Sequence, residues 1–378
     1  MENKIAIIGS GLAGLNCAKY LEKHNKFSID VYEKNSVIGG RIQTDEVDGF
    51  LCDHGFQVFL TKYPEAMNSF IYNNLQLYNF KAGAKIDGEY VGDPFREPST
   101  FFSTVFSSIG TLKDKILILK LRFERLSNLE KETALEFLTQ YGFSQKMINQ
   151  FFKPFFSGVF LNKDLENSAD FFLFLYKLFS RSYATLPLNG MRDLPKNIAD
   201  QLKHTTFHLN SSVEIKNSST IEDNGEIKNY DFVISAFAQQ ETRFYSVTTD
   251  YFWANKSDAP YFSKALEIFT KNKYINHLAP ISLVNPNYAP EDKILLSVNS
   301  LVNAPVEDIH KELAHIYPGL KLNFLKRYEV KKALPKINSP VPVSNEVIRC
   351  GDFLETPSIN GALASGRKAA ELICTNLS

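Results

Sequence analysis

The segment that most constrains the fold lies at the start of the chain. Residues 5–8 are Ile-Ala-Ile-Ile, a pattern typical of a buried strand. Three glycines follow at the spacing GxGxxG: Gly9, Gly11 and Gly14. A helical pattern over 12–24 comes next, and a second strand pattern over 28–32 ends at Glu33. Strand, glycine turn, helix and strand in this order predict a unit that binds a dinucleotide.

Each part of this unit has a physical role in binding. The first glycine allows a tight turn, the second lets the backbone approach a pyrophosphate, and the third lets helix and strand pack closely. The free N–H groups at the helix N-terminus face the phosphates. Glu33 lies 22 residues after Gly11, where it accepts hydrogen bonds from a ribose 2′-hydroxyl and disfavours the 2′-phosphate of NADP. The candidate cofactor residues of this segment are Gly9, Ser10, Gly11, Leu12, Ala13, Gly14, Glu33 and Lys34.

Composition excludes several classes of protein. The 378 residues suffice for two domains, or for one large domain with an inserted cap. The 42 Lys and Arg balance the 42 Asp and Glu, which argues against nucleic acid as the main partner. The four cysteines show no CxxC spacing and the seven histidines show no metal-ligand spacing, so we expect buried thiols and no metal site. With no secretory signal pattern and no apolar run of membrane-span length, we expect a cytoplasmic protein.

Aromatic residues concentrate in the middle of the chain. The sequence holds 31 Phe, and many of them lie in the segments 151–160 and 171–179. One interpretation is the core of a helical subdomain. The other is an apolar substrate tunnel, or a face that dips into a membrane surface. The two interpretations are compatible, and peripheral membrane contact stays open.

Four further motifs follow along the chain: Gly39-Gly40-Arg41, Asp53-x-Gly55, Pro187-x-Asn189-Gly190-Met191-x-x-Leu194-Pro195, and Gly351-Asp352 with Ser358-Ile-Asn-Gly361-Ala362. In order and spacing, the five motifs resemble those of the FAD-dependent amine oxidase/phytoene desaturase superfamily. The resemblance spans nearly the whole chain. Within the superfamily, the segments 152–160, 289–298 and 365–367 resemble the desaturase-like branch of bacteria and plastids.

The resemblance implies that FAD binds in an extended form, with its adenine beside Glu33 and its isoalloxazine ring near the C-terminal motif. Arg41 would offer positive charge beside the phosphates and the ribityl chain. Asp352 would accept a hydrogen bond from a ribityl hydroxyl or from the phosphate side. The free N–H groups over 359–362 would stabilise the negative charge of reduced flavin. The resemblance adds these candidates: Gly40, Arg41, Gly55, Phe56, Gln57, Val213, Gly351, Asp352, Ile359, Asn360 and Ala362.

Helical patterns over 95–182 and strand patterns over 244–300 separate the motifs, although no Gly/Ser-rich linker marks a boundary. From the motif positions and the resemblance we expect an α/β protein with two domains. A discontinuous, Rossmann-like FAD-binding domain of the ββα type would comprise residues 1–80, 185–240 and 335–378. A second, α+β substrate-binding domain would comprise a helical insert, 81–184, and a β-rich part, 241–334.

The chain also departs from the family pattern. Amine oxidases of this superfamily place an aromatic residue shortly before the C-terminal Gly-Ala, whereas residues 356–360 contain none, so an aromatic cage for an amine is in doubt. Amine oxidases of this fold also use a lysine that holds a water near flavin N5. Lys264, Lys271 and Lys273 occupy a comparable region, but the sequence selects none of them. Catalytic residues beyond the flavin therefore remain unassigned.

These features predict an FAD-dependent oxidoreductase that transfers a hydride from a substrate carbon to flavin N5. The expected substrate is apolar: an isoprenoid, a carotenoid or another lipid-like molecule. Because no second GxGxxG is present, the expected electron acceptor is oxygen, a quinone or another protein. The alternatives are an amine oxidase that releases peroxide, an isomerase that uses reduced FAD, and a non-catalytic flavin or lipid carrier. On the first motif alone, a nicotinamide-dependent dehydrogenase is the runner-up.

Overall fold

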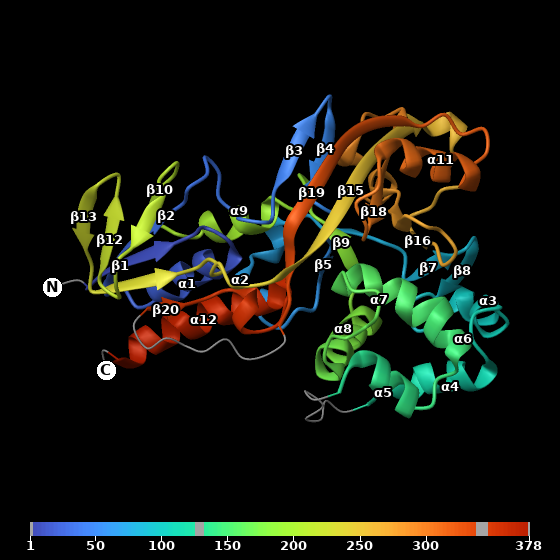
Figure 1. The fold of residues 1–378 in the computed structure, drawn as a ribbon, viewed down its shortest axis with the longest axis horizontal. Coiled ribbons are helices and arrows are strands. Elements are labelled where there is room, and N and C mark those ends of the chain that lie inside the picture. Colours follow the sequence, from blue (N-terminus) through green and yellow to red (C-terminus); the bar gives the residue numbers. More distant parts are fainter. Residues whose placement is uncertain (1–2, 125–131, 338–346, 377–378) are drawn as a thin grey trace.

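A parallel sheet lies at the end of the molecule that holds both termini (Figure 1). The computed structural model describes residues 3–124, 132–337 and 347–376. The sheet has five strands in the order β10 (Thr205–His208), β2 (Phe27–Tyr32), β1 (Asn3–Ile8), β14 (Phe232–Ser235) and β20 (Ile348–Arg349). All neighbouring strands are parallel, so their carboxyl ends meet at one edge.

Both faces of this sheet are covered, which explains the uninterrupted apolar pattern of β1. Ile5 and Ile7 pack against α1 (Leu12–Glu22) and α12 (Ile359–Asn376). Ala6 and Ile8 face an antiparallel sheet of β11 (Val213–Ile215), β12 (Thr220–Asp223) and β13 (Glu226–Asn229). The first helix ends two residues before the predicted boundary, and Asn25 turns the chain with a φ of 49°.

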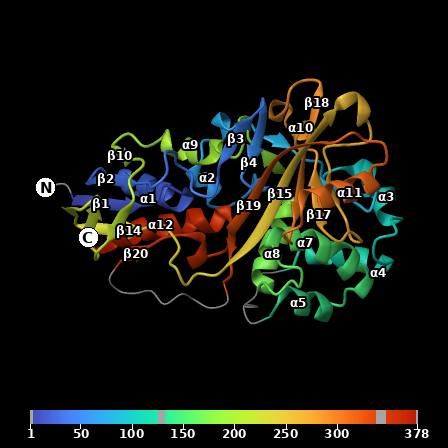
Figure 2. The same cartoon turned by 45° about the horizontal axis from the view of Figure 1, so that its top comes forward.

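A larger sheet occupies the other half of the molecule (Figure 2). Its order is β19 (Asn323–Pro335), β15 (Phe244–Asn255), β18 (Lys293–Ser300), β17 (Ile275–Ala279), β16 (Leu266–Ile268), β7 (Gly83–Ile86) and β8 (Glu89–Gly92). Every pair is antiparallel except β16 with β7. The helix α11 (Val306–Ile316) packs on this sheet through Ile309 and Leu313.

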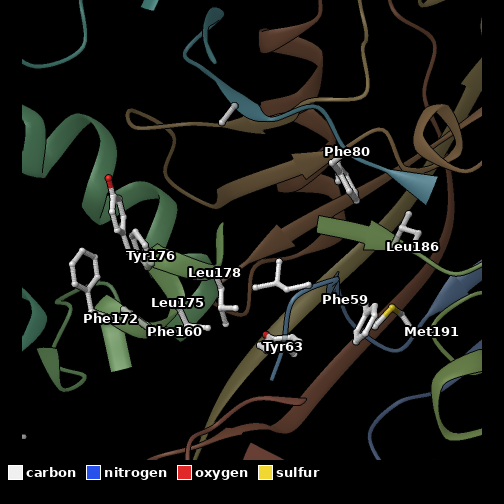
Figure 3. Packing of buried hydrophobic residues seen from close by; sticks show 14 of the residues in the cluster. Phe59, Tyr63, Phe80, Phe160, Phe172, Leu175, Tyr176, Leu178, Leu186 and Met191 are labelled. Carbon is white, nitrogen blue, oxygen red and sulfur yellow. The ribbon is translucent and has the colours of Figure 1, made fainter. Parts of the chain in front are cut away.

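A helical insert packs beside the large sheet. It comprises α3 (Phe101–Val105), α4 (Leu112–Leu121), α5 (Ala134–Gln140), α6 (Gln145–Met147), a π-helical turn (Ile148–Phe152), α7 (Lys153–Phe160) and α8 (Ala169–Arg181). Capping boxes begin α4 at Thr111 and α5 at Thr133, where each hydroxyl accepts from the third backbone N–H of its helix. Figure 3 shows the core running from Phe160 and Phe172 in this insert to Phe59 near the sheets.

Further short elements lie outside these two sheets and the helical insert. They are β3 (Thr44–Val47), β4 (Phe50–Asp53), β5 (Phe59–Leu60), α2 (Ala66–Ser69), β6 (Tyr78–Asn79), β9 (Ala184–Leu186), α9 (Asp193–Ala199) and α10 (Ile281–Val284). The chain thus has the mixed α/β architecture expected from its sequence. The parallel sheet draws its strands from three separate parts of the sequence, and the bounds of two domains remain a prediction.

Candidate functional site

A cavity of about 1330 Å³ extends from the carboxyl edge of the parallel sheet to the helical insert. Its volume exceeds the roughly 300–1,000 Å³ of pockets for drug-sized ligands, so it has room for a dinucleotide and a second molecule. Sixteen of the candidate residues line it: Gly9, Gly11, Leu12, Ala13, Glu33, Lys34, Gly40, Arg41, Gly55, Phe56, Gln57, Val213, Gly351, Asp352, Ile359 and Ala362.

The glycines of the first motif meet different needs. A Cβ on Gly11 would have no atom within 4 Å, because this backbone borders open space in the cavity. A Cβ on Gly14 would lie 2.1 Å from the carbonyl oxygen of Gly9, so this glycine allows the strand and α1 to pack closely. Gly14 therefore does not line the cavity and acts through packing.

The buried carboxylate of Glu33 is held in place at the sheet edge. One of its oxygens accepts from the backbone N–H of Ser10 at 3.1 Å and from the Ser10 hydroxyl at 2.8 Å. The other oxygen accepts from the backbone N–H of Asn35 at 3.0 Å. Ser10 itself is buried and does not line the cavity, so its structural role is to orient Glu33.

Arg41 and Asp352 form an ion pair on the cavity wall. Asp352 is buried, whereas the guanidinium of Arg41 is partly exposed and also donates to the carbonyl of Ala333 at 3.0 Å. The sequence placed both residues at the cofactor, but it did not predict that they pair with each other. An arginine held in this way keeps donors available for an anionic ligand.

Asp53 organises the segment that contains Gly55. Its buried carboxylate accepts hydrogen bonds from the Thr44 hydroxyl, the Met191 backbone N–H and the Tyr288 hydroxyl. Burial raises the pKa of Asp53 to about 6, and these three hydrogen bonds act in the opposite direction. Two sequence motifs, around 53–55 and 187–195, thus meet at one carboxylate and position the cavity wall.

The N-terminus of α12 faces the cavity less openly than expected. Ile359 and Ala362 line it, but the backbone N–H of Ala362 bonds to the carbonyl of Ser358. The N–H of Gly361 bonds to the Ser358 hydroxyl at 3.0 Å. The expectation of free N–H groups throughout 359–362 was therefore wrong, because Ser358 caps the helix.

The structure does not bring every candidate to the cavity. Asn360 turns its side chain toward the backbone N–H of Glu65, from which its oxygen accepts at 3.0 Å. Asn360 therefore does not line the cavity, and neither do Lys264, Lys271 and Lys273. None of these three lysines is therefore a candidate for contact with a ligand in the cavity.

The cavity wall also holds polar residues that were not predicted from the sequence, among them Asn276, His277 and Asn299. They lie on β17 and β18, and no motif singled out from the sequence includes any of the three. The Nε2 atom of His277 lies 2.9 Å from the carbonyl oxygen of Pro154, and burial lowers the pKa of this imidazole to about 4. The ring is therefore neutral at physiological pH.

The wall of the cavity fits FAD in its chemistry. The glycines at 9, 11 and 40 leave backbone accessible, and an ideal Cβ on Gly40 would lie 3.3 Å from the Cα of Gly11. A buried carboxylate at the sheet edge suits a ribose, and a held guanidinium suits a pyrophosphate. The apolar surface of Phe56, Val213 and Ile359 suits aromatic rings.

Comparisons with known proteins agree with this chemistry. The model of the family described as flavin containing amine oxidoreductase matches residues 12–243. The 15-cis-phytoene desaturase of Synechococcus elongatus is 38% identical over 74 residues, which cover 19% of this chain and 15% of that protein. The 1-hydroxycarotenoid 3,4-desaturase of a Flavobacterium is 28% identical over 201 residues, which cover 48% of this chain and 39% of that protein. The chain thus spans less than half the length of these curated relatives.

A solved structure extends the likeness to the complete fold. An oxidoreductase from Methanosarcina mazei superposes with a TM-score of 0.75 at 16% identity, over 97% of this chain and 100% of that one. Within the described ranges 3–124, 132–337 and 347–376, no helix is both long enough and apolar enough to cross a membrane.

Proposed function

The chain belongs to the flavin-containing amine oxidoreductases and is an FAD-dependent oxidoreductase, and on this basis we propose that it dehydrogenates an apolar substrate. The candidate residues that line the cavity would hold FAD in a discontinuous, Rossmann-like domain. Arg41 would contact the pyrophosphate, Glu33 the adenosine ribose, and Gly55 with Phe56 the flavin ring. Bound FAD supplies the two-electron acceptor at ring atom N5.

The observation that carries the choice of an apolar substrate is the pairing of the acids on the cavity wall. Among the residues that the structure describes, three carboxylates line the cavity, from Glu33, Asp93 and Asp352. Glu33 is held by backbone and hydroxyl donors, Asp93 by Arg96 and Arg122, and Asp352 by Arg41. Each of these carboxylates already has a partner, so within the described part of the chain the cavity wall offers no unpaired acid for a substrate ammonium group. This supports a neutral substrate over an amine.

The part of the cavity in the helical insert is largely apolar. Its lining includes Ile109, Leu119, Phe151, Phe155 and Phe179. These side chains would bind the substrate by burying its hydrocarbon surface, at about 25 cal/mol per Å². They would also exclude water from the substrate carbon that loses the hydride. The predicted substrate tunnel and the predicted helical core thus involve the same phenylalanine-rich helices.

Exposed apolar residues surround this end of the cavity, and we infer peripheral contact with a lipid surface there. Phe102 and Phe106 are 71% and 80% exposed. Leu112 and Ile116 are exposed too, and these two side chains line the cavity. The four residues belong to α3, the turn after it and α4, at the end of the molecule away from the termini (Figure 1). Lys113, Lys120 and Lys146 are exposed on the same insert. Apolar side chains flanked by lysines favour an anionic bilayer surface.

An anaerobic titration tests the proposed reaction. Oxidised holoenzyme is mixed with isoprenoids or carotenoid precursors in vesicles, or with polyamines and aromatic amines, while the flavin absorbance is followed. Bleaching by an isoprenoid supports the proposal, and bleaching by an amine with peroxide release on exposure to oxygen contradicts it. A requirement for reductant without its stoichiometric consumption would instead indicate an isomerase. The reduced flavin is then mixed with oxygen or with a quinone. Rapid reoxidation by one of the two would identify it as the class of electron acceptor, and slow reoxidation by both would indicate a protein acceptor.

Matched variants link the reaction to the cavity. Phe155→Glu places a charge on the cavity wall and should abolish bleaching by an apolar substrate while FAD stays bound. Phe324→Glu changes an exposed phenylalanine away from the cavity and should have little effect. For the lipid surface, the Phe102→Ser/Phe106→Ser double variant should sediment less with anionic vesicles than the wild type does. Leu372→Ser on α12 is its control.

A further inference from the structure

A row of polar side chains crosses the large sheet on the face that meets the cavity. In the strand register, His277 of β17 lies opposite Asn299 of β18, and Asn299 lies opposite Thr249 of β15. Residues directly opposite each other share a face of the sheet. Thr249 lies near Gly55, since a Cβ on that glycine would be 4.0 Å from the Thr249 hydroxyl oxygen. The row therefore runs from the helical insert toward the proposed flavin ring.

A bulge adds a further amide to this row. The register of β17 against β18 shifts between Ile275 and His277, which leaves Asn276 as the extra residue. A β-bulge redirects a side chain out of the regular alternation. Asn276 accordingly lines the cavity beside His277, and its side-chain oxygen Oδ1 accepts from the Ser157 hydroxyl of α7 at 3.0 Å.

The two asparagines share one feature, a buried amide nitrogen without a partner. The side-chain oxygen Oδ1 of Asn299 accepts from the Thr249 hydroxyl at 2.7 Å, so each side-chain amide is held in place by its oxygen. Among the described residues, neither Nδ2 atom has a hydrogen-bond partner, and Asn299 is only 5% exposed. Buried donors are nearly always paired in folded proteins. These two point to a ligand atom that accepts hydrogen bonds.

We propose that Asn276 and Asn299 form a subsite that binds a neutral oxygen atom of the substrate, such as that of a ketone, an ether or a hydroxyl group. This inference rests on the proposed function, because it places the subsite within a cavity for an apolar molecule. Both amides are uncharged and the neighbouring His277 is neutral, so the subsite suits a neutral oxygen better than a carboxylate or phosphate. A pure hydrocarbon would leave both donors unpaired.

Three probes of equal chain length test the subsite: hexadecane, 2-hexadecanone and 1-hexadecanol. Binding to the oxidised holoenzyme is measured by the shift of the flavin absorption band and by the rise in unfolding temperature. We expect the ketone and the alcohol to bind roughly tenfold more tightly than hexadecane, as one net hydrogen bond to a buried donor implies. In Asn299→Leu and in Asn276→Leu, ketone binding should weaken toward that of hexadecane.

Hexadecane binding reports whether each variant keeps a folded cavity, and Asn276→Leu serves if Asn299→Leu does not fold. Asn272→Leu is the matched control, because the Nδ2 of Asn272 is also without a partner in the described structure but does not line the cavity. Equal binding of all three probes to the wild type would overturn the subsite alone. A ketone preference that survives both Leu variants would also overturn it. Failure of every probe to bind would count against the apolar cavity itself, and so against the subsite.

Discussion

The guanidinium of Arg41 pairs with the carboxylate of Asp352, a residue 311 positions later in the chain. The pair joins the loop between β2 and β3 to the segment that precedes α12. Both residues line the cavity. Because the buried acid holds the arginine, the guanidinium loses little side-chain entropy when an anion binds. Preorganisation of this kind is what a pyrophosphate site requires.

Replacement of Arg41 tests its role in cofactor binding. Arg41→Ala should raise the dissociation constant of FAD by about 10- to 100-fold, the value of a charge-assisted hydrogen bond. Arg41→Lys should fall between this variant and the wild type, since lysine keeps the charge but not the planar fork. Quenching of flavin fluorescence during reconstitution gives the constants. Lys196→Ala, an exposed cation off the cavity, is the control. Unchanged FAD affinity in Arg41→Ala would remove this residue from the site.

Substitutions of two glycines in the first motif should impair FAD binding for different reasons. Gly11→Val adds atoms to open space in the cavity, so the protein should fold with a nearly unchanged unfolding temperature but bind FAD poorly. Gly14→Val drives a side chain into the Gly9 carbonyl, so stability itself should fall, by about 3 kcal/mol or more. Thermal unfolding of the apoprotein, measured beside FAD titration, separates the two effects. Equal losses of stability in both variants would contradict this division.

Gly366 sets the closest approach between α12 and α1. A Cβ on this residue would lie 2.2 Å from the carbonyl oxygen of Ala13. Gly366→Val should therefore destabilise the fold by about 3 kcal/mol or more, because two helix backbones must separate. Urea unfolding measures the loss, and Leu372→Val on the exposed side of the same helix is the control. A change below about 1 kcal/mol in Gly366→Val would show that the helices can shift apart freely.

Asp53 and His277 should make opposite contributions to the pH dependence of stability. Burial raises the pKa of Asp53 to about 6, so between about pH 4 and pH 6 the folded state holds a proton that the unfolded state releases. This contribution lowers stability as pH rises. Burial lowers the pKa of His277 to about 4, so between about pH 4 and pH 6.5 the unfolded state holds the extra proton and stability rises with pH.

Single variants separate these two contributions. Asp53→Asn should make the slope of unfolding free energy against pH more positive between pH 4 and pH 6. His277→Gln should make it more negative, each by at most about 1.4 kcal/mol per pH unit. Denaturant unfolding across this pH range measures both slopes. His315→Gln, at an exposed position, is the control variant. Shifts of the same sign in the two variants would contradict the assigned directions.

Much of the predicted FAD-binding segment at the start of the chain could be read from the sequence, because the residues that form it are close together in the chain. The turn at Gly9, the start of α1 at Leu12 and the end of β2 near Glu33 depend on residues close in sequence, and the structure places them where the motif predicts. Family membership and FAD followed from the same motifs. The individual contacts with FAD stay a prediction. The capping of α12 by the Ser358 hydroxyl is also local, but the sequence interpretation of 358–362 rested on the helix dipole alone and did not predict it.

What the sequence by itself determined is therefore the nucleotide-binding unit, the order of its motifs and the flavin chemistry that they imply. Only the tertiary structure decided that Arg41 meets Asp352 and that Asp53 meets Tyr288. It alone placed Asn276 and Asn299 on one cavity wall. The reason is physical. A turn or a helix start depends on neighbouring residues, whereas these pairs depend on strand register and on a bulge, which are settled only when distant segments pack.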